Sequence, residues 1–202
     1  MDNYQLQAQQ AKKFFLTYDQ QRLISKLSLH YDEAYLYTSV LCQPYRIHRV
    51  TGDLQKQENG RWLDANTHAE VMTLLDLVCD SREDRKVSGR WVSLQLLGRM
   101  FHRQLAEQSD PLAEYINSHP QQFQKACLAL QGQPLPGGDM GWHIPFFDCL
   151  RLGLQFWHSD EEFPPKLHIM WDENALQFLR YETAWFATGL IRKRLRELMD
   201  RL

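Results

Sequence analysis

The sequence predicts an α+β fold, with one or two small antiparallel or mixed sheets packed with helices and a long helix at the C-terminus. Residues 34–50, 142–157 and 166–171 are rich in β-branched and aromatic side chains, and they alternate as strands do. The segments between and after them repeat apolar residues at helical spacing. Apolar residues make up 44% of the 202, which is enough material for a packed core.

The first half is expected to contain a helix, a strand pair and a second helix. The N-terminal segment is rich in glutamine and lysine and keeps helical spacing, with a break near Asp19. Two strands are expected around Pro44, and Asn59-Gly60 predicts a sharp hairpin in the segment that follows. Asn66 or Thr67 can cap the next helix, because either side chain accepts a hydrogen bond from the first helical turn.

In the second half, helices come first and strands follow. Ser93 begins one helix, and Asp110 with Pro111 opens another, which Pro120 breaks. Residues 132–141 form a turn-rich loop that leads into the later strands.

The C-terminal helix is expected to begin at Asp172, whose carboxylate can accept from backbone N–H groups near Asn174. Its apolar face is assigned to positions at helical intervals: Leu179, Glu182, Phe186, Leu190 and Leu198. Glu182 is the exception on that face, because an unpaired buried charge is costly. An ion pair, with Arg46 or Arg151, or a pocket around Glu182 is therefore expected.

The chain is expected to be a single domain over residues 1–202. A short echo, "LDAN" at 63–66 and "WDEN" at 171–174, precedes a helix in each half. It suggests related halves at about 34–80 and 139–190, with a helical section at 93–131 between them.

Composition and charge exclude several functional classes. A formal charge of −2 and a pI near 6.4 argue against a nucleic-acid-binding protein. No apolar run is long enough to span a membrane, and the N-terminus lacks a signal-peptide pattern, so a cytoplasmic location is expected. The four cysteines are scattered singly, which matches neither a disulfide framework nor iron–sulfur ligand spacing.

The run "FWHSDEEFPPKLHIMW" draws attention, because three consecutive acids lie between two expected strands. On an extended chain His158, Asp160 and Glu162 share one side, and His143 and His168 lie on flanking strands. Such a group can bind a ligand or a divalent metal. The alternative is an acidic bend that stays in water and is ended by the two prolines. The candidate ligand-binding residues are Asp139, His143, Asp148, His158, Asp160, Glu161 and Glu162.

The stretch from "GWHIPFFDCLRLGLQFWHSDEEFPPKLHIMW" to "RYET", with the earlier "PYRIHRVTGDL" and "SGRWVSLQLL", resembles an uncharacterised bacterial family, domain of unknown function 3786. The resemblance covers about Ala34 to Leu190, and its most specific part is Asp160, Glu161, Phe163 and Pro164. It implies a single family domain without an assigned activity. Some relatives are described as iron–sulfur proteins because of an extra cysteine-rich module, which this chain lacks.

Three functions remain open at this point. The first is a non-enzymatic cytoplasmic binding or accessory protein whose small-molecule or protein partner is unknown. The second is a metal-dependent enzyme, in which His143, His158 and Asp160 hold a divalent ion and Glu162 acts as base. The third is a structural protein–protein interaction module that docks through its C-terminal helix or its aromatic surface. Neither a nucleic acid nor a membrane is expected as a partner.

Overall fold

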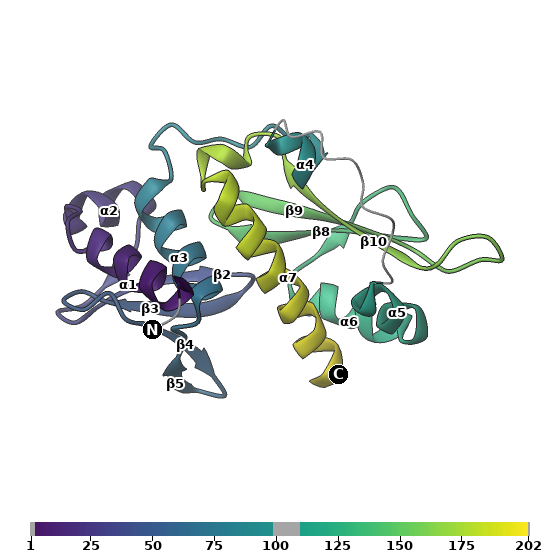
Figure 1. The fold of residues 1–202 in the computed structure, drawn as a ribbon, viewed down its shortest axis with the longest axis horizontal. Coiled ribbons are helices and arrows are strands. Elements are labelled where there is room, and N and C mark those ends of the chain that lie inside the picture. Colours follow the sequence, from purple (N-terminus) through teal and green to yellow (C-terminus); the bar gives the residue numbers. More distant parts are fainter. Residues whose placement is uncertain (1–2, 99–109, 202) are drawn as a thin grey trace. The chain divides into compact units, whose positions relative to one another are not determined.

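The computed structural model describes residues 3–98 and 110–201 of the chain (Figure 1). Within these residues the fold is α+β, as predicted, with two antiparallel five-stranded sheets and a long C-terminal helix. They divide into two compact units. The first unit takes the described residues up to Arg85 and Gln177–Leu190, and the second takes the described residues of Lys86–Leu176 and those from Ile191 onward.

The first unit is built on a sheet with the order β1-β2-β3-β4-β5, in which each strand is antiparallel to the next. Leu36, Ile47 and Leu54 pair across three strands and are completely buried, so they form an apolar stripe. The elements of this unit are α1 (Asn3–Phe15), α2 (Gln20–Leu27), β1 (His30–Tyr31), β2 (Tyr35–Val40), β3 (Gln43–His48), β4 (Leu54–Glu58), β5 (Arg61–Asp64), α3 (His68–Asp80) and the first part of α7 (Tyr181–Arg201).

The expected helix break near Asp19 and the expected cap at Thr67 are both confirmed. The Asp19 carboxylate accepts from the N–H groups of Gln21 and Arg22, and it separates α1 from α2. Thr67 and Glu70 form a capping box at the start of α3.

The turns of the sheet follow from residues that accept a positive φ. The hairpin at Asn59 and Gly60 is confirmed, with φ values of 49° and 75°. The two strands expected around Pro44 are confirmed as β2 and β3, but the turn between them lies before Pro44, at Leu41 and Cys42, which both have positive φ. Pro44 lies inside β3 and pairs with β2 alone, so the ladder to β4 does not need the N–H that proline lacks.

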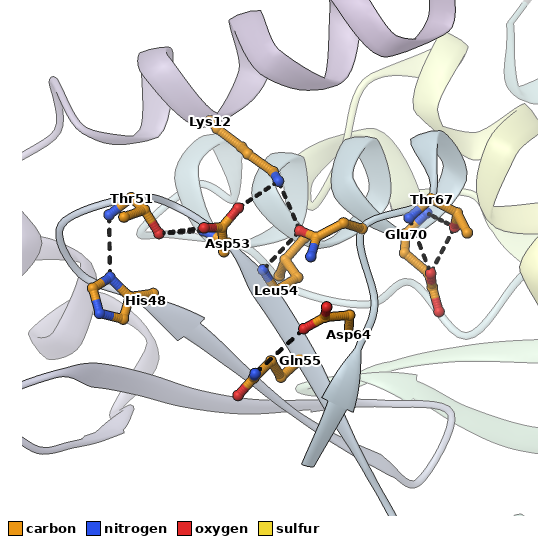
Figure 2. Close-up of polar contacts among 10 residues, drawn as sticks. Lys12, His48, Thr51, Asp53, Leu54, Gln55, Asp64, Thr67 and Glu70 are labelled. Atoms are coloured by element: carbon orange, nitrogen blue, oxygen red, sulfur yellow. Dashed lines mark hydrogen bonds and ion pairs between the residues drawn. The ribbon is translucent and has the colours of Figure 1, made fainter.

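A polar network joins α1 to the β3–β4 turn (Figure 2). Lys12 Nζ donates to Asp53 Oδ1 and to Asn66 Oδ1, both at 2.7 Å. Asn66 Oδ1 also accepts from the Leu54 N–H at 3.0 Å, and the Thr51 hydroxyl donates to the second Asp53 oxygen at 2.7 Å. The lysine hydrogen bond holds the pKa of Asp53 below its usual value. One lysine therefore links a helix, a turn and the segment before α3.

The second unit is built on a sheet with the order β6-β10-β9-β8-β7. Leu152, Leu154 and Phe156 of β9 are completely buried, and the rings of Phe146 and Trp171 meet edge to face at 5.3 Å. The expected helix break at Pro120 is confirmed, since one helix ends at Ser118 and the next begins at Pro120. The elements are β6 (Trp91–Ser93), α4 (Leu94–Leu97), α5 (Pro111–Ser118), α6 (Pro120–Ala129), β7 (Gln133–Pro134), β8 (Met140–Phe147), β9 (Leu150–Trp157), β10 (Lys166–Asp172), η1 (Ala175–Gln177) and the last part of α7.

The C-terminal helix begins at Tyr181, so the expectation that it begins at Asp172 is wrong. Asp172 is the last residue of β10, and its buried carboxylate accepts from the N–H groups of Ser88, Gly89 and Asn174. The bond to Asn174 is the local contact that the sequence indicates. The bonds to residues 88 and 89 come from a distant segment, and they make the aspartate an anchor of that loop.

The later start also corrects the predicted apolar face of α7. The buried apolar positions are Ala184, Ala187, Ile191, Leu195 and Met199, and Thr183 is buried beside them, whereas Glu182 is exposed. Glu182 therefore faces solvent, and the expected ion pair or pocket around it is not found in the described part of the chain. The reason is that Ala184 and Ala187 lie on the buried side of the helix, which turns Glu182 outward. Neither α7 nor any other helix within residues 3–98 and 110–201 is long and apolar enough to cross a membrane.

Candidate functional site

A pocket of about 500 Å³ lies in the second unit, where the loop before β8 meets the hairpin between β9 and β10. Its size is within the range of small-ligand sites. The residues that line it are Asp139, Trp157, His158, Asp160, Phe163, Pro164, Lys166 and His168.

The loop before β8 is held against the end of β9. Gly138 has a φ of 72°, and a Cβ at this position would lie 2.6 Å from the Phe156 carbonyl oxygen. The close approach lets the Asp139 N–H donate to that carbonyl at 2.8 Å. The Asp139 carboxylate accepts in turn from the His158 N–H at 2.7 Å. A glycine thus allows the contact that brings the Asp139 carboxylate into the pocket wall.

The acidic hairpin is a compact turn built on Asp160. The Asp160 Oδ1 atom accepts from the N–H groups of Glu162 at 2.9 Å and of Phe163 at 2.7 Å. The Asp160 N–H also donates to the Phe163 carbonyl at 3.1 Å. The Phe163 side chain is left 62% exposed on this turn.

Hydrogen bonds orient His158 in the pocket wall. The Asn117 Oδ1 atom accepts from the Ser159 N–H at 3.3 Å and lies 2.9 Å from His158 Nδ1. Because a backbone N–H only donates, the Asn117 atom is an acceptor, and His158 Nδ1 carries the proton of the second bond. Beside it, the rings of Trp157 and His168 meet edge to face at 4.9 Å.

The structure brings three of the predicted site residues together, since Asp139, His158 and Asp160 all line the pocket. Glu161 and Glu162 lie on the same turn, exposed to solvent and outside the lining.

The other two predicted residues lie elsewhere in this sheet. His143 pairs with Gly153 in the middle of the β8–β9 ladder, and its Nδ1 accepts from Arg151 at 3.3 Å. Burial, and then the charge of Arg151, lowers the pKa of His143. Asp148 is exposed in the turn that joins the far ends of β8 and β9. Antiparallel pairing places this turn at the opposite end of the strands from Trp157.

Sequence reasoning missed four of the lining residues: Trp157, Phe163, Pro164 and Lys166. Trp157 pairs with Lys166 as the last rung of the β9–β10 ladder. The acidic turn could have indicated this pair, because a hairpin brings the residues on either side of its turn opposite each other.

The proposed metal ligands are not assembled. His143 is absent from the pocket that His158 and Asp160 line. Among residues 3–98 and 110–201, no group of three His, Cys, Asp or Glu side chains is arranged to hold a metal ion.

Comparisons with known proteins place the sequence in one family. The model of a domain of unknown function, DUF3786, matches residues 19–194. No curated protein matches the chain, and no solved structure matches it.

Proposed function

The chain belongs to the DUF3786 family, and on that premise we propose that it is a non-enzymatic binding protein whose pocket takes a cationic side chain of a partner protein. The observation that carries this proposal is the pairing of two carboxylates, Asp139 and Asp160, with the aromatic side chains of Trp157 and Phe163 in one pocket. A guanidinium group suits such a pocket, because it pairs with carboxylates and stacks on aromatic rings.

The two carboxylates are preorganised. Asp139 uses Oδ2, and Asp160 uses Oδ1, to accept backbone N–H groups that fix each side chain. The second oxygen of each side chain has no hydrogen bond to any described residue, so it can accept from a ligand. A carboxylate that is already held loses little side-chain entropy when it binds.

The charge around the pocket supports a cationic partner. Glu161 and Glu162 add two exposed carboxylates beside the two in the lining. Lys166 contributes one positive charge to the lining, so negative charge is in excess around the pocket. Negative charge at the mouth attracts a basic segment and repels the phosphates of a nucleic acid. The exposed Phe163 supports a protein partner over a free amine, because a protein surface can also cover an apolar ring.

A cytoplasmic location is part of this proposal. None of the four cysteines is in a disulfide bond, although Cys149 is exposed. Cysteines outside disulfide bonds are typical of proteins in a reducing compartment.

The test is binding of an N-acetyl arginine-containing tripeptide amide, followed by ¹H–¹⁵N NMR of the full chain. The peptide is expected to shift the amides of Trp157, His158 and Phe163, and a glutamate-containing peptide is expected to leave them unchanged. Asp160→Asn should weaken binding about ten-fold, because asparagine keeps the acceptor for the turn but removes the charge.

Asp148→Asn is the matched control, since it removes the same charge from an exposed residue outside the pocket. Equal binding by the two variants, or equal binding of the glutamate peptide, would contradict the proposal.

A further inference from the structure

We propose that a second pocket, in the first unit, binds a small molecule that carries a carboxylate or phosphate on an apolar body. The pocket has a volume of about 550 Å³. It lies where the end of α1, the length of α2 and the residues that follow α3 meet. The lining residues are Phe14, Thr17, Tyr18, Asp19, Arg22, Leu23, Lys26, Cys79, Ser81, Arg82 and Glu83.

Part of the wall is apolar. The rings of Phe14 and Tyr18 meet edge to face at 5.2 Å, and Leu23 of α2 is 2% exposed. Phe14 itself is 54% exposed, so a ligand that covers the ring removes apolar surface from water. The wall thus offers a surface for an aromatic or aliphatic body.

Lys26 is the least exposed of the three cationic residues in the wall. Its Nζ donates to the Cys79 carbonyl oxygen at 2.8 Å, and it forms no ion pair with any described residue. Burial lowers the pKa of Lys26, because removal from water disfavours the charged ammonium. The Cys79 thiol offers no counter-charge, because burial raises its pKa to about 12. An anion placed beside Lys26 would offset this desolvation.

Two guanidinium groups lie in the same wall and can turn toward a ligand. Arg22 pairs with Glu83 at 2.8 Å, and Arg82 pairs with Asp84 at 2.7 Å. The side chains of both pairs are between 58% and 72% exposed, and ion pairs that are so exposed contribute little to stability. Exchanging one of these carboxylates for a ligand anion therefore costs little.

The acidic groups near the pocket are already engaged. The Asp19 carboxylate caps α2. Behind the wall, the Asp80 carboxylate accepts from the Tyr18 hydroxyl at 2.6 Å and lies 3.3 Å from Arg180 Nε. The charges of Asp80 and of Glu83, which pairs with Arg22, partly compensate Lys26, and the cationic groups of the lining are Lys26, Arg22 and Arg82.

The proposal is tested by calorimetric titration of the full chain with 3-phenylpropionate and with phenyl phosphate. At least one of the two is expected to bind in the low-millimolar range or tighter, and their ratio identifies the preferred anion. The uncharged 3-phenylpropanol and inorganic phosphate are each expected to bind at least about ten-fold more weakly, since each lacks one half of the ligand.

Variants assign the binding to this pocket. Lys26→Met, which keeps the length of the side chain, should weaken binding about ten-fold. Arg82→Met removes an exposed charge without disturbing the core, and it should weaken binding by a smaller factor. Lys13→Met is the matched control, because Lys13 is exposed on α1 and outside the lining.

Three results would overturn the proposal: no saturable binding of either aromatic anion, equal binding of the neutral alcohol, or unchanged binding in both Lys26→Met and Arg82→Met. Inorganic phosphate that binds as tightly as phenyl phosphate would indicate an adventitious ion only. None of these variants touches the pocket of the second unit, so this test and that of the proposed function fail independently.

Discussion

Replacing Gly138 by alanine tests how the pocket of the second unit is built. Gly138 has a φ of 72°, a backbone conformation that costs a residue with a Cβ about 1–2 kcal/mol. The added Cβ would also lie 2.6 Å from the Phe156 carbonyl oxygen, well inside van der Waals contact. The neighbouring atom is backbone in a paired strand and cannot swing away, so the loop has to move.

The loss of stability expected for Gly138→Ala is worked out by comparison with a second glycine of similar φ. Gly89 has a φ of 76°, and no atom lies within 4 Å of the position that a methyl group would take there, so Gly89→Ala carries the conformational cost alone. That cost is about 1 kcal/mol, after the entropy that alanine removes from the unfolded chain is subtracted. Gly138→Ala adds an overlap of about 1–3 kcal/mol, for a total of roughly 2–4 kcal/mol.

The assay is chemical unfolding of both variants beside the wild type, with amide hydrogen exchange as the local measurement. Moving the loop should break the bond from His158 N to Asp139 Oδ2, so the His158 amide should exchange faster in Gly138→Ala only. If Gly138→Ala destabilises the protein no more than Gly89→Ala, and His158 keeps its protection, the contact between the loop and β9 does not exist as described.

Three further outcomes are expected. Asp172→Asn should lower the free energy of unfolding by about 2 kcal/mol, because its new amide group faces backbone donors, whereas the exposed Glu161→Gln should change little in the same urea titration. Asp53→Asn should cost under about 1 kcal/mol at neutral pH, since this carboxylate is half exposed. Its lowered pKa makes that stability present above about 3.8 and lost as the pH falls through the folded value, so unfolding curves of variant and wild type should converge at low pH. Ellman's reagent should label the exposed Cys149 in the native protein, but Cys127, whose pKa is raised by burial, only after unfolding.

Much of the secondary structure could be predicted, because its determinants are local. Asp19 and Thr67 cap helices with atoms two or three residues away, and the Asn59-Gly60 turn depends on two residues that accept positive φ. The start of the C-terminal helix was predicted wrongly because a distant segment intervened. Asp172 makes its expected local bond to Asn174, but pairing with β6 and β9 keeps it in a strand instead of a helix cap.

The candidate site was predictable as a segment but not as a set of contacts. The alternation rule grouped His158, Asp160 and Glu162, of which the first two line the pocket and Glu162 does not, because residues 160–163 form a turn instead of a strand. The family resemblance pointed to the same turn. Neither signal separates Asp139, which precedes β8 and contacts this turn, from His143, which lies four residues later, inside β8. The internal repeat of the two halves stays a prediction.

The amino-acid sequence by itself determined the α+β class, the helix caps and the sharp turns, because each depends on interactions within a few residues. Only the tertiary structure decided which polar side chains share a pocket and which face of α7 is buried. Both outcomes depend on strand register and helix phase, which are set by the burial of apolar side chains that are far apart along the chain. A shift of one residue in the register of β9 or β10 would move their side chains to the other face of the sheet and would dismantle the pocket wall.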